Sequence, residues 1–141
     1  MKGKTIEELV VGQSAEFSKT ITESDVVIFG GISGDLNPAH FNEEYAKKSI
    51  FKKRVAHGAL VASLFSTVLG TGLPGEGTIY LSQESKFVKP VYFGDTITAK
   101  VEVSEILNEK NRVVLQTTAY NQFNEVVIVG KALVMPPKNL E

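Results

Sequence analysis

Gly58-Ala59-Leu60-Val61-Ala62-Ser63-Leu64-Phe65-Ser66-Thr67-Val68-Leu69 is the stretch of sequence that decides the fold. It has no charged residue and is apolar around most of a helical circumference, so a helix formed by it must be covered on nearly every side. Gly70, Gly72 and Pro74 are expected to end this helix. Four Ser/Thr residues and three glycines interrupt residues 55–73, which favours a buried protein helix over a membrane span.

Downstream of this helix the hydrophobic pattern changes to a period of two. Ile97, Ala99, Val101 and Val103 alternate with polar residues, which predicts a strand with one face in the core. Similar runs near residues 78–87, 112–123 and 126–135 predict three more strands, and residues 14–21 predict a more exposed first strand. We expect the four later strands to follow one another as a meander.

Short helices are predicted between the first strand and the apolar helix. Thr22-Glu23-Ser24-Asp25 is a helix-start signal, because the Thr22 hydroxyl can accept a hydrogen bond from an unpaired backbone N–H. The helix should run to about Ile32. Residues 34–40 are expected to form a loop, since Pro38 lacks an N–H and favours extended geometry before it. Asn42 can cap a further helix over residues 43–48.

These elements predict an α+β hot-dog fold, in which an antiparallel sheet wraps the apolar central helix. The length of 141 residues is that of one domain, expected to cover residues 1–141. A sheet covers only one flank of its helix well, so the remaining apolar surface predicts a homodimer.

Composition excludes several classes of function. The formal net charge of −1 gives no electrostatic reason to expect nucleic acid or membrane as a partner. The absence of cysteine excludes disulfide scaffolds and thiol nucleophiles, and it favours a reducing cytoplasm. No export signal is visible, because acidic residues follow the basic N-terminus where an apolar core is needed. Two histidines without a metal-ligand spacing predict no metal, and no cofactor is expected.

The first candidate for chemistry is Asp35-Leu36-Asn37-Pro38-Ala39-His40. In a regular helix, five residues would turn the Asp35 and His40 side chains roughly 140° apart, so they can meet only on an irregular backbone such as Pro38 imposes. They then form an acid–base pair. The alternative is a turn in which Asp35 accepts hydrogen bonds from backbone donors while His40 lies at the surface.

The second candidate is His57-Gly58, where the chain enters the apolar helix. A glycine there lets a ligand approach backbone N–H groups at the positive end of the helix dipole, which could hold a developing oxyanion. The alternative is a permissive glycine beside a structural histidine.

The combination of motifs resembles one family. Asp35 to His40, then Val55-Ala56-His57-Gly58, then Phe87-Val88-Lys89-Pro90-Val91-Tyr92-Phe93-Gly94-Asp95 are similar, in order and spacing, to the signatures of MaoC-like (R)-specific enoyl-CoA hydratases. The resemblance extends from about Gly12 to Met135. It implies a homodimer that hydrates trans-2-enoyl-CoA, with short to medium acyl chains, to (R)-3-hydroxyacyl-CoA.

The resemblance also implies roles for single residues. Asp35 and His40 would be the catalytic pair, the Gly58 N–H would polarise the thioester carbonyl, Ser66 would line the site, and Asn37 would brace the loop. An acyl-CoA thioester would be the substrate. For basic residues such as Arg54, a solvated face is favoured over contact with its phosphates.

Three other functions remain open at this point. A dehydratase acting on (R)-3-hydroxyacyl groups of acyl carrier protein would use the same chemistry. A non-catalytic acyl-thioester binding module would bind without turnover. A hot-dog thioesterase would release free thiol.

Overall fold

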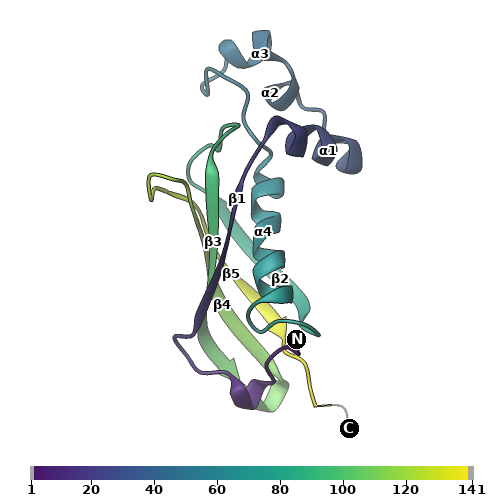
Figure 1. The fold of residues 1–141 in the computed structure, drawn as a ribbon, viewed down its shortest axis with the longest axis vertical. Coiled ribbons are helices and arrows are strands. Elements are labelled where there is room, and N and C mark those ends of the chain that lie inside the picture. Colours follow the sequence, from purple (N-terminus) through teal and green to yellow (C-terminus); the bar gives the residue numbers. More distant parts are fainter. Residues whose placement is uncertain (1, 140–141) are drawn as a thin grey trace.

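The computed structural model of the protein, described here for residues 2–139, is an antiparallel sheet of five strands packed against one long helix (Figure 1). This is the α+β hot-dog fold. Its elements are β1 Ser14–Thr20, α1 Glu23–Ser33, α2 Pro38–Phe41, α3 Glu43–Lys47, α4 Gly58–Thr71, β2 Ile79–Phe87, β3 Thr96–Leu107, β4 Arg112–Tyr120 and β5 Val126–Met135, with short 3₁₀ turns at Ile6–Glu8 and Asn108–Lys110.

The order of strands in the sheet is β1-β3-β4-β5-β2. Strands β3, β4 and β5 form the expected meander, but β2 pairs with β5 at the sheet edge, where Phe87 lies opposite Ile128. The prediction that all four later strands meander was therefore wrong for β2. A hydrophobic period shows which face of a strand is buried, whereas the neighbour of that strand depends on the path of the connections.

The core lies between the sheet and α4. The predicted inward face of β3, Ile97 to Val103, is fully buried, which confirms the two-residue pattern. Helix α4 contributes Val61, Leu64, Phe65, Val68 and Leu69. Its opposite side carries Ala59, Ser63 and Ser66, which are exposed. One chain therefore covers the face of α4 that carries the large apolar side chains and leaves uncovered a face of small side chains.

Helices α1, α2 and α3 group together beyond the sheet, at the end where α4 begins (Figure 1). Helix α1 begins as predicted, because the Thr22 hydroxyl accepts from the Asp25 N–H at 3.1 Å. Residues 34–40 are not entirely loop as predicted, since Pro38 starts the single turn α2. Proline suits the first position of a helix, and the Asn37 side chain caps the turn by accepting from the Ala39 N–H at 3.1 Å.

No helix within residues 2–139 is long and apolar enough to span a membrane.

Candidate active site

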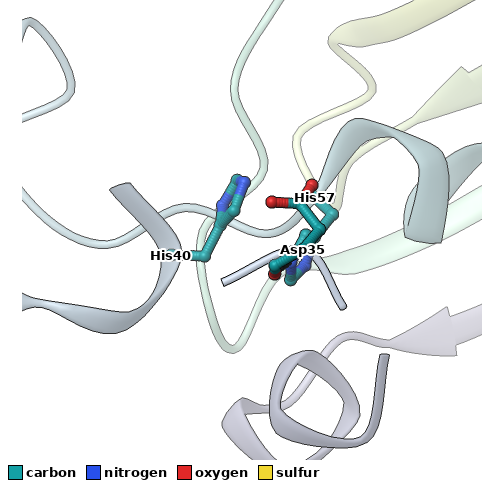
Figure 2. Close-up of side chains that lie close together, drawn as sticks. All are labelled: Asp35, His40 and His57. Atoms are coloured by element: carbon teal, nitrogen blue, oxygen red, sulfur yellow. Dashed lines mark hydrogen bonds between the residues drawn. The ribbon is translucent and has the colours of Figure 1, made fainter. Parts of the chain in front are cut away.

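Asp35 and His40 meet at the end of the molecule formed by the short helices. Asp35 follows α1, where Gly34 ends the helix with a left-handed φ of 79°, and His40 lies in α2. A carboxylate oxygen of Asp35 and ring nitrogens of His40 and His57 all lie within 4.8 Å of one another (Figure 2). The irregular backbone inferred from Pro38 thus brings the predicted pair together.

The turn around Asp35 has features of both predicted arrangements, the acid–base pair and the turn in which Asp35 bonds backbone donors. The Asp35 carboxylate accepts a hydrogen bond from the Asn37 N–H at 3.2 Å, as the turn alternative requires. The same side chain is exposed and faces His40, so it remains available for chemistry (Figure 2). His40 is half-buried rather than a surface residue. The backbone contact therefore holds the carboxylate without occupying it fully.

Hydrogen bonds fix the orientation and the tautomer of His40. Its Nδ1 lies 2.7 Å from the Val55 carbonyl oxygen, and a carbonyl only accepts, so Nδ1 carries a proton and Nε2 is left to exchange one. The Arg54 Nε donates to the His40 carbonyl at 2.7 Å, and its guanidinium pairs with Glu23 at 2.5 Å. The Arg54 side chain is only 12% exposed, so the prediction of a solvated basic face was wrong for this residue.

Helix α4 begins beside this pair with its first N–H groups unpaired. His57 occupies the N-cap position but makes no capping hydrogen bond with its side chain. Within residues 2–139, the N–H groups of Gly58, Ala59 and Leu60 have no hydrogen-bond partner. Unpaired N–H groups at the positive end of a helix dipole attract an oxyanion. A Cβ built on Gly58 would lie 2.8 Å from the Phe87 ring, so glycine allows this close approach without a shift of that ring.

A cavity of about 590 Å³ opens at this point. Its lining includes Asn37, His40, Gly58, Val61, Phe87 and Lys89. The cavity therefore combines mostly apolar walls with the imidazole and the start of α4, a combination typical of sites for small organic ligands.

Not every predicted site residue lines this cavity. Asp35 is absent from its walls although its carboxylate lies beside His40. Ser66 is exposed on α4, about 12 Å along the helix from Gly58 at the usual rise per residue, and it does not contact the cavity. The structure of one chain thus brings Asp35, Asn37, His40 and Gly58 together and leaves Ser66 apart. Lys89 lines the cavity and pairs with Glu125.

The close approach of Asp35, His40 and His57 raises the question of a metal site. One nitrogen of each imidazole already contacts a carbonyl oxygen, His40 Nδ1 that of Val55 and His57 Nε2 that of Asp35. The two rings stack, with centroids 3.9 Å apart and planes inclined by 31°. With one nitrogen of each ring held by a carbonyl and the Asp35 carboxylate beside His40, the arrangement suits acid–base chemistry.

Comparison with known proteins shows the family of this chain. The family model described as MaoC like domain matches residues 7–134. The chain belongs to the MaoC-like domain family. Its relatives in this family include an (R)-specific enoyl-CoA hydratase of Rhodospirillum rubrum, 51% identical over 93% of this chain and 90% of that protein. A 3-hydroxybutyryl-CoA dehydratase of Methylorubrum extorquens is 46% identical over 96% of this chain and 85% of that protein.

A solved structure of a similar protein has the same fold as this chain. The unliganded R-hydratase of Pseudomonas aeruginosa superposes with a TM-score of 0.91 at 43% identity, covering 97% of this chain and 88% of that one.

Two features of this MaoC-like site were not assigned from the sequence. Phe87 was quoted in a motif without a role, and it covers Gly58 from strand β2. His57 was left between a ligand-binding and a structural interpretation, and it contacts both Asp35 and His40. Their apolar or buried character gave no signal of these contacts, which join segments distant in the chain.

Proposed function

We infer that this protein is an (R)-specific enoyl-CoA hydratase, a hydro-lyase that adds water reversibly to trans-2-enoyl-CoA to give (R)-3-hydroxyacyl-CoA. One observation carries the inference: the Asp35–His40 pair lies beside the unpaired start of α4 in a chain 51% identical to an enzyme of that name. The apolar walls of the cavity suit an acyl chain, and the polar groups gather at one end of it.

Asp35 and His40 hold the attacking water. The Asp35 carboxylate and the unbonded Nε2 of His40 are both acceptors, and a water molecule has two protons to donate. One water between them is therefore oriented with its oxygen lone pair free to attack C3 of the substrate. As the new C–O bond forms, the pair takes one proton from the water, and it gives one proton to C2.

The start of α4 stabilises the charge that this attack creates. The π electrons of the C2–C3 bond move toward the thioester oxygen, which becomes enolate-like. The Gly58 N–H, unpaired at the positive end of the helix, donates a hydrogen bond to that oxygen. Protonation at C2 then restores the carbonyl, so the net reaction adds one water and changes no oxidation state of the enzyme.

Supporting roles go to two further residues. Asn37 braces the loop, since its side chain caps α2 and its N–H bonds the Asp35 carboxylate. Ser66 remains a proposal for a substrate-lining residue, reached from the exposed face of α4 rather than from the cavity within one chain.

Incubation with crotonyl-CoA tests this function directly. Loss of the enoyl absorbance together with an (R)-3-hydroxybutyryl product is expected. An (S) product, or no reaction with any short enoyl-CoA, would contradict the proposal. Parallel assays separate the alternatives: faster turnover on an acyl-carrier-protein thioester identifies a dehydratase of that carrier, release of free thiol identifies a thioesterase, and binding without turnover identifies a binding module.

We also propose that the protein is a homodimer that associates through β2. This strand is at the sheet edge and exposes large apolar side chains, Ile79, Leu81 and Phe87, with Val88 following. An exposed apolar edge strand is a template for pairing with a second strand. The small side chains on the uncovered face of α4 would allow a second copy to approach closely. Sedimentation at micromolar concentration is expected to give a dimer, and an active monomer would contradict the proposal.

A further inference from the structure

His57 joins the elements of the proposed site. His57 is only 2% exposed, and it is the N-cap residue of α4. The Nε2 atom lies 2.9 Å from the backbone carbonyl oxygen of Asp35, 22 residues earlier in the chain. Because a carbonyl only accepts, Nε2 carries a proton and donates it to this bond. The buried imidazole therefore ties the turn that carries the Asp35 carboxylate to the start of α4.

The same ring also fixes His40. The two imidazoles stack with centroids 3.9 Å apart, so His57 covers one face of the His40 ring. Phe29 of α1 and Phe41 of α2 pack around His57, with ring centroids at 4.8 Å and 5.8 Å. Together with the Nδ1 bond to Val55, this packing leaves the His40 ring little freedom to rotate.

A histidine at this position is not explained by packing alone. With Nε2 protonated, Nδ1 of the neutral ring is an acceptor, and it is buried with no hydrogen-bond partner among the described residues. A buried polar atom without a partner costs free energy. A phenylalanine would fill the same aromatic surroundings without that cost. What a phenylalanine lacks is the Nε2 donor to Asp35.

His57 does not reach the substrate cavity. Its neighbours Ala56 and Gly58 both line the cavity, whereas His57 is not among the lining residues. Any effect of this side chain on turnover must therefore pass through a neighbour, and its side chain contacts two of the proposed site residues, Asp35 and His40.

We propose that His57 is a positioning residue for the hydration reaction, which holds the Asp35 carboxylate at its working distance from His40 by donating Nε2–H to the Asp35 carbonyl. This inference rests on the proposed function. A displaced acid or base at a reacting centre lowers the rate steeply, on the order of 10²-fold for a shift near one ångström. Substrate affinity depends on cavity walls that His57 does not form.

Two substitutions separate the hydrogen bond from the packing. His57→Phe keeps an aromatic ring among Phe29, His40 and Phe41 but removes the donor. His57→Gln removes the ring but places an amide N–H near the position of Nε2. With crotonyl-CoA, we expect kcat to fall at least about tenfold in His57→Phe while KM changes less than about threefold, and to be higher in His57→Gln than in His57→Phe.

A matched control removes loss of stability as an explanation. Val103→Ala leaves a gap in the fully buried face of β3, opposite Leu115 of β4 and outside the lining of the cavity, and it lowers stability without changing a residue of the proposed site. At a temperature where this variant and His57→Phe are both folded by circular dichroism, Val103→Ala should retain the wild-type kcat.

The Asp35→Asn background supplies the final test. If His57 acts through the Asp35 carboxylate, adding His57→Phe to Asp35→Asn should lower kcat little further. Should His57→Phe not fold, His57→Leu, which also lacks the donor, carries the same test in both backgrounds. Wild-type kcat in a folded His57→Phe variant, a kcat in His57→Gln no higher than in His57→Phe, or fully multiplicative losses with Asp35→Asn would each overturn the proposal. A wild-type protein inactive on enoyl-CoA would instead overturn the proposed function.

Discussion

Helices α1 and α4 both begin near the proposed site, but their N-termini are capped differently. At the start of α1, the Thr22 hydroxyl accepts from the Asp25 N–H at 3.1 Å, and the Asp25 carboxylate accepts from the Thr22 N–H at 2.9 Å. At the start of α4, the side chain of the N-cap residue His57 accepts a hydrogen bond from none of the N–H groups of the first turn. The first N-terminus is capped by residues of its own first turn. The second N-terminus has no side-chain cap, so its N–H groups are free to bind a ligand.

The difference separates a structural end from a functional one. Reciprocal bonds in a capping box stabilise a helix, whereas unpaired N–H groups beside a cavity are available to a ligand. Changes at the start of α4 should therefore alter turnover more than stability. Changes at the start of α1 should alter stability more than turnover.

The largest expected effect comes from removing the pair that faces the open end of α4. Asp35→Asn keeps the shape of the turn but removes the charge, and His40→Gln keeps a polar side chain without an imidazole. Each should lower kcat by roughly 10²-fold or more, with a much smaller change in substrate binding. Because both residues hold one water, the double variant should be hardly worse than the poorer single one.

Steady-state kinetics on the two single variants, the double variant and wild type, with circular dichroism to confirm folding, measure this effect. Folded single variants with near-wild-type turnover would contradict the mechanism. Strictly multiplicative losses would argue against a shared water.

A matched pair of substitutions at Gly58 tests the open end itself. Proline is tolerated at the first position of a helix, and His57 already has the extended backbone that a following proline requires, with φ −61° and ψ 132°. Gly58→Pro therefore removes the N–H while α4 can still form. Gly58→Ala adds the same Cβ beside Phe87 but keeps the N–H.

The kcat of Gly58→Pro should be about 10²-fold below that of Gly58→Ala, the usual loss for one oxyanion donor. The Phe87 ring is 55% exposed and can move away from the new Cβ, so both variants should keep most of their stability. Equal kcat values in the two variants would show that this N–H does not act in the reaction.

The capped end of α1 should respond in the opposite way. Thr22→Ala removes the acceptor of the Asp25 N–H, and it should lower the free energy of unfolding by about 1 kcal/mol. The kcat for crotonyl-CoA should stay within about twofold of wild type, since the cap is not among the residues that line the cavity. Chemical denaturation and steady-state kinetics on the same preparation measure both. A large loss of kcat with unchanged stability would contradict the assignment of a structural role to the start of α1.

The smallest effect is the dependence of the α1 cap on pH. The backbone bond from Thr22 lowers the pKa of Asp25 below its ordinary value of 3.8, and a bond from Lys19 lowers it further against the opposing effect of burial. A lowered carboxyl pKa contributes stability that is present above the unfolded value and lost as pH falls through the folded one.

Asp25→Asn should therefore lower the melting temperature above about pH 5, and the difference from wild type should shrink as pH falls below 3.8. Thermal unfolding across this range measures the trend. A difference that grows as the pH is lowered would contradict the assigned role of the carboxylate.

Much of the fold could be read from local patterns. The period of two located β3 and β5, the Thr22 signal located the start of α1, and the uncharged run located α4. Each of these depends on neighbours within a few residues of one another, so the sequence carries the information directly. For Asp35 and His40, five residues apart around Pro38, the local pattern left a pair and a turn open, and the family resemblance favoured the pair.

What the sequence by itself determined is therefore the set of elements, the family resemblance and the catalytic candidates within one loop. Only the tertiary structure placed β2 beside β5, covered Gly58 with Phe87, partly buried Arg54 and brought His57 onto Asp35 and His40. These contacts join residues 14 to more than 40 positions apart, and their energy depends on which surfaces the chain path brings together. Hydrophobic periodicity predicts which side chains are buried. The residues against which they pack are determined only by the tertiary structure.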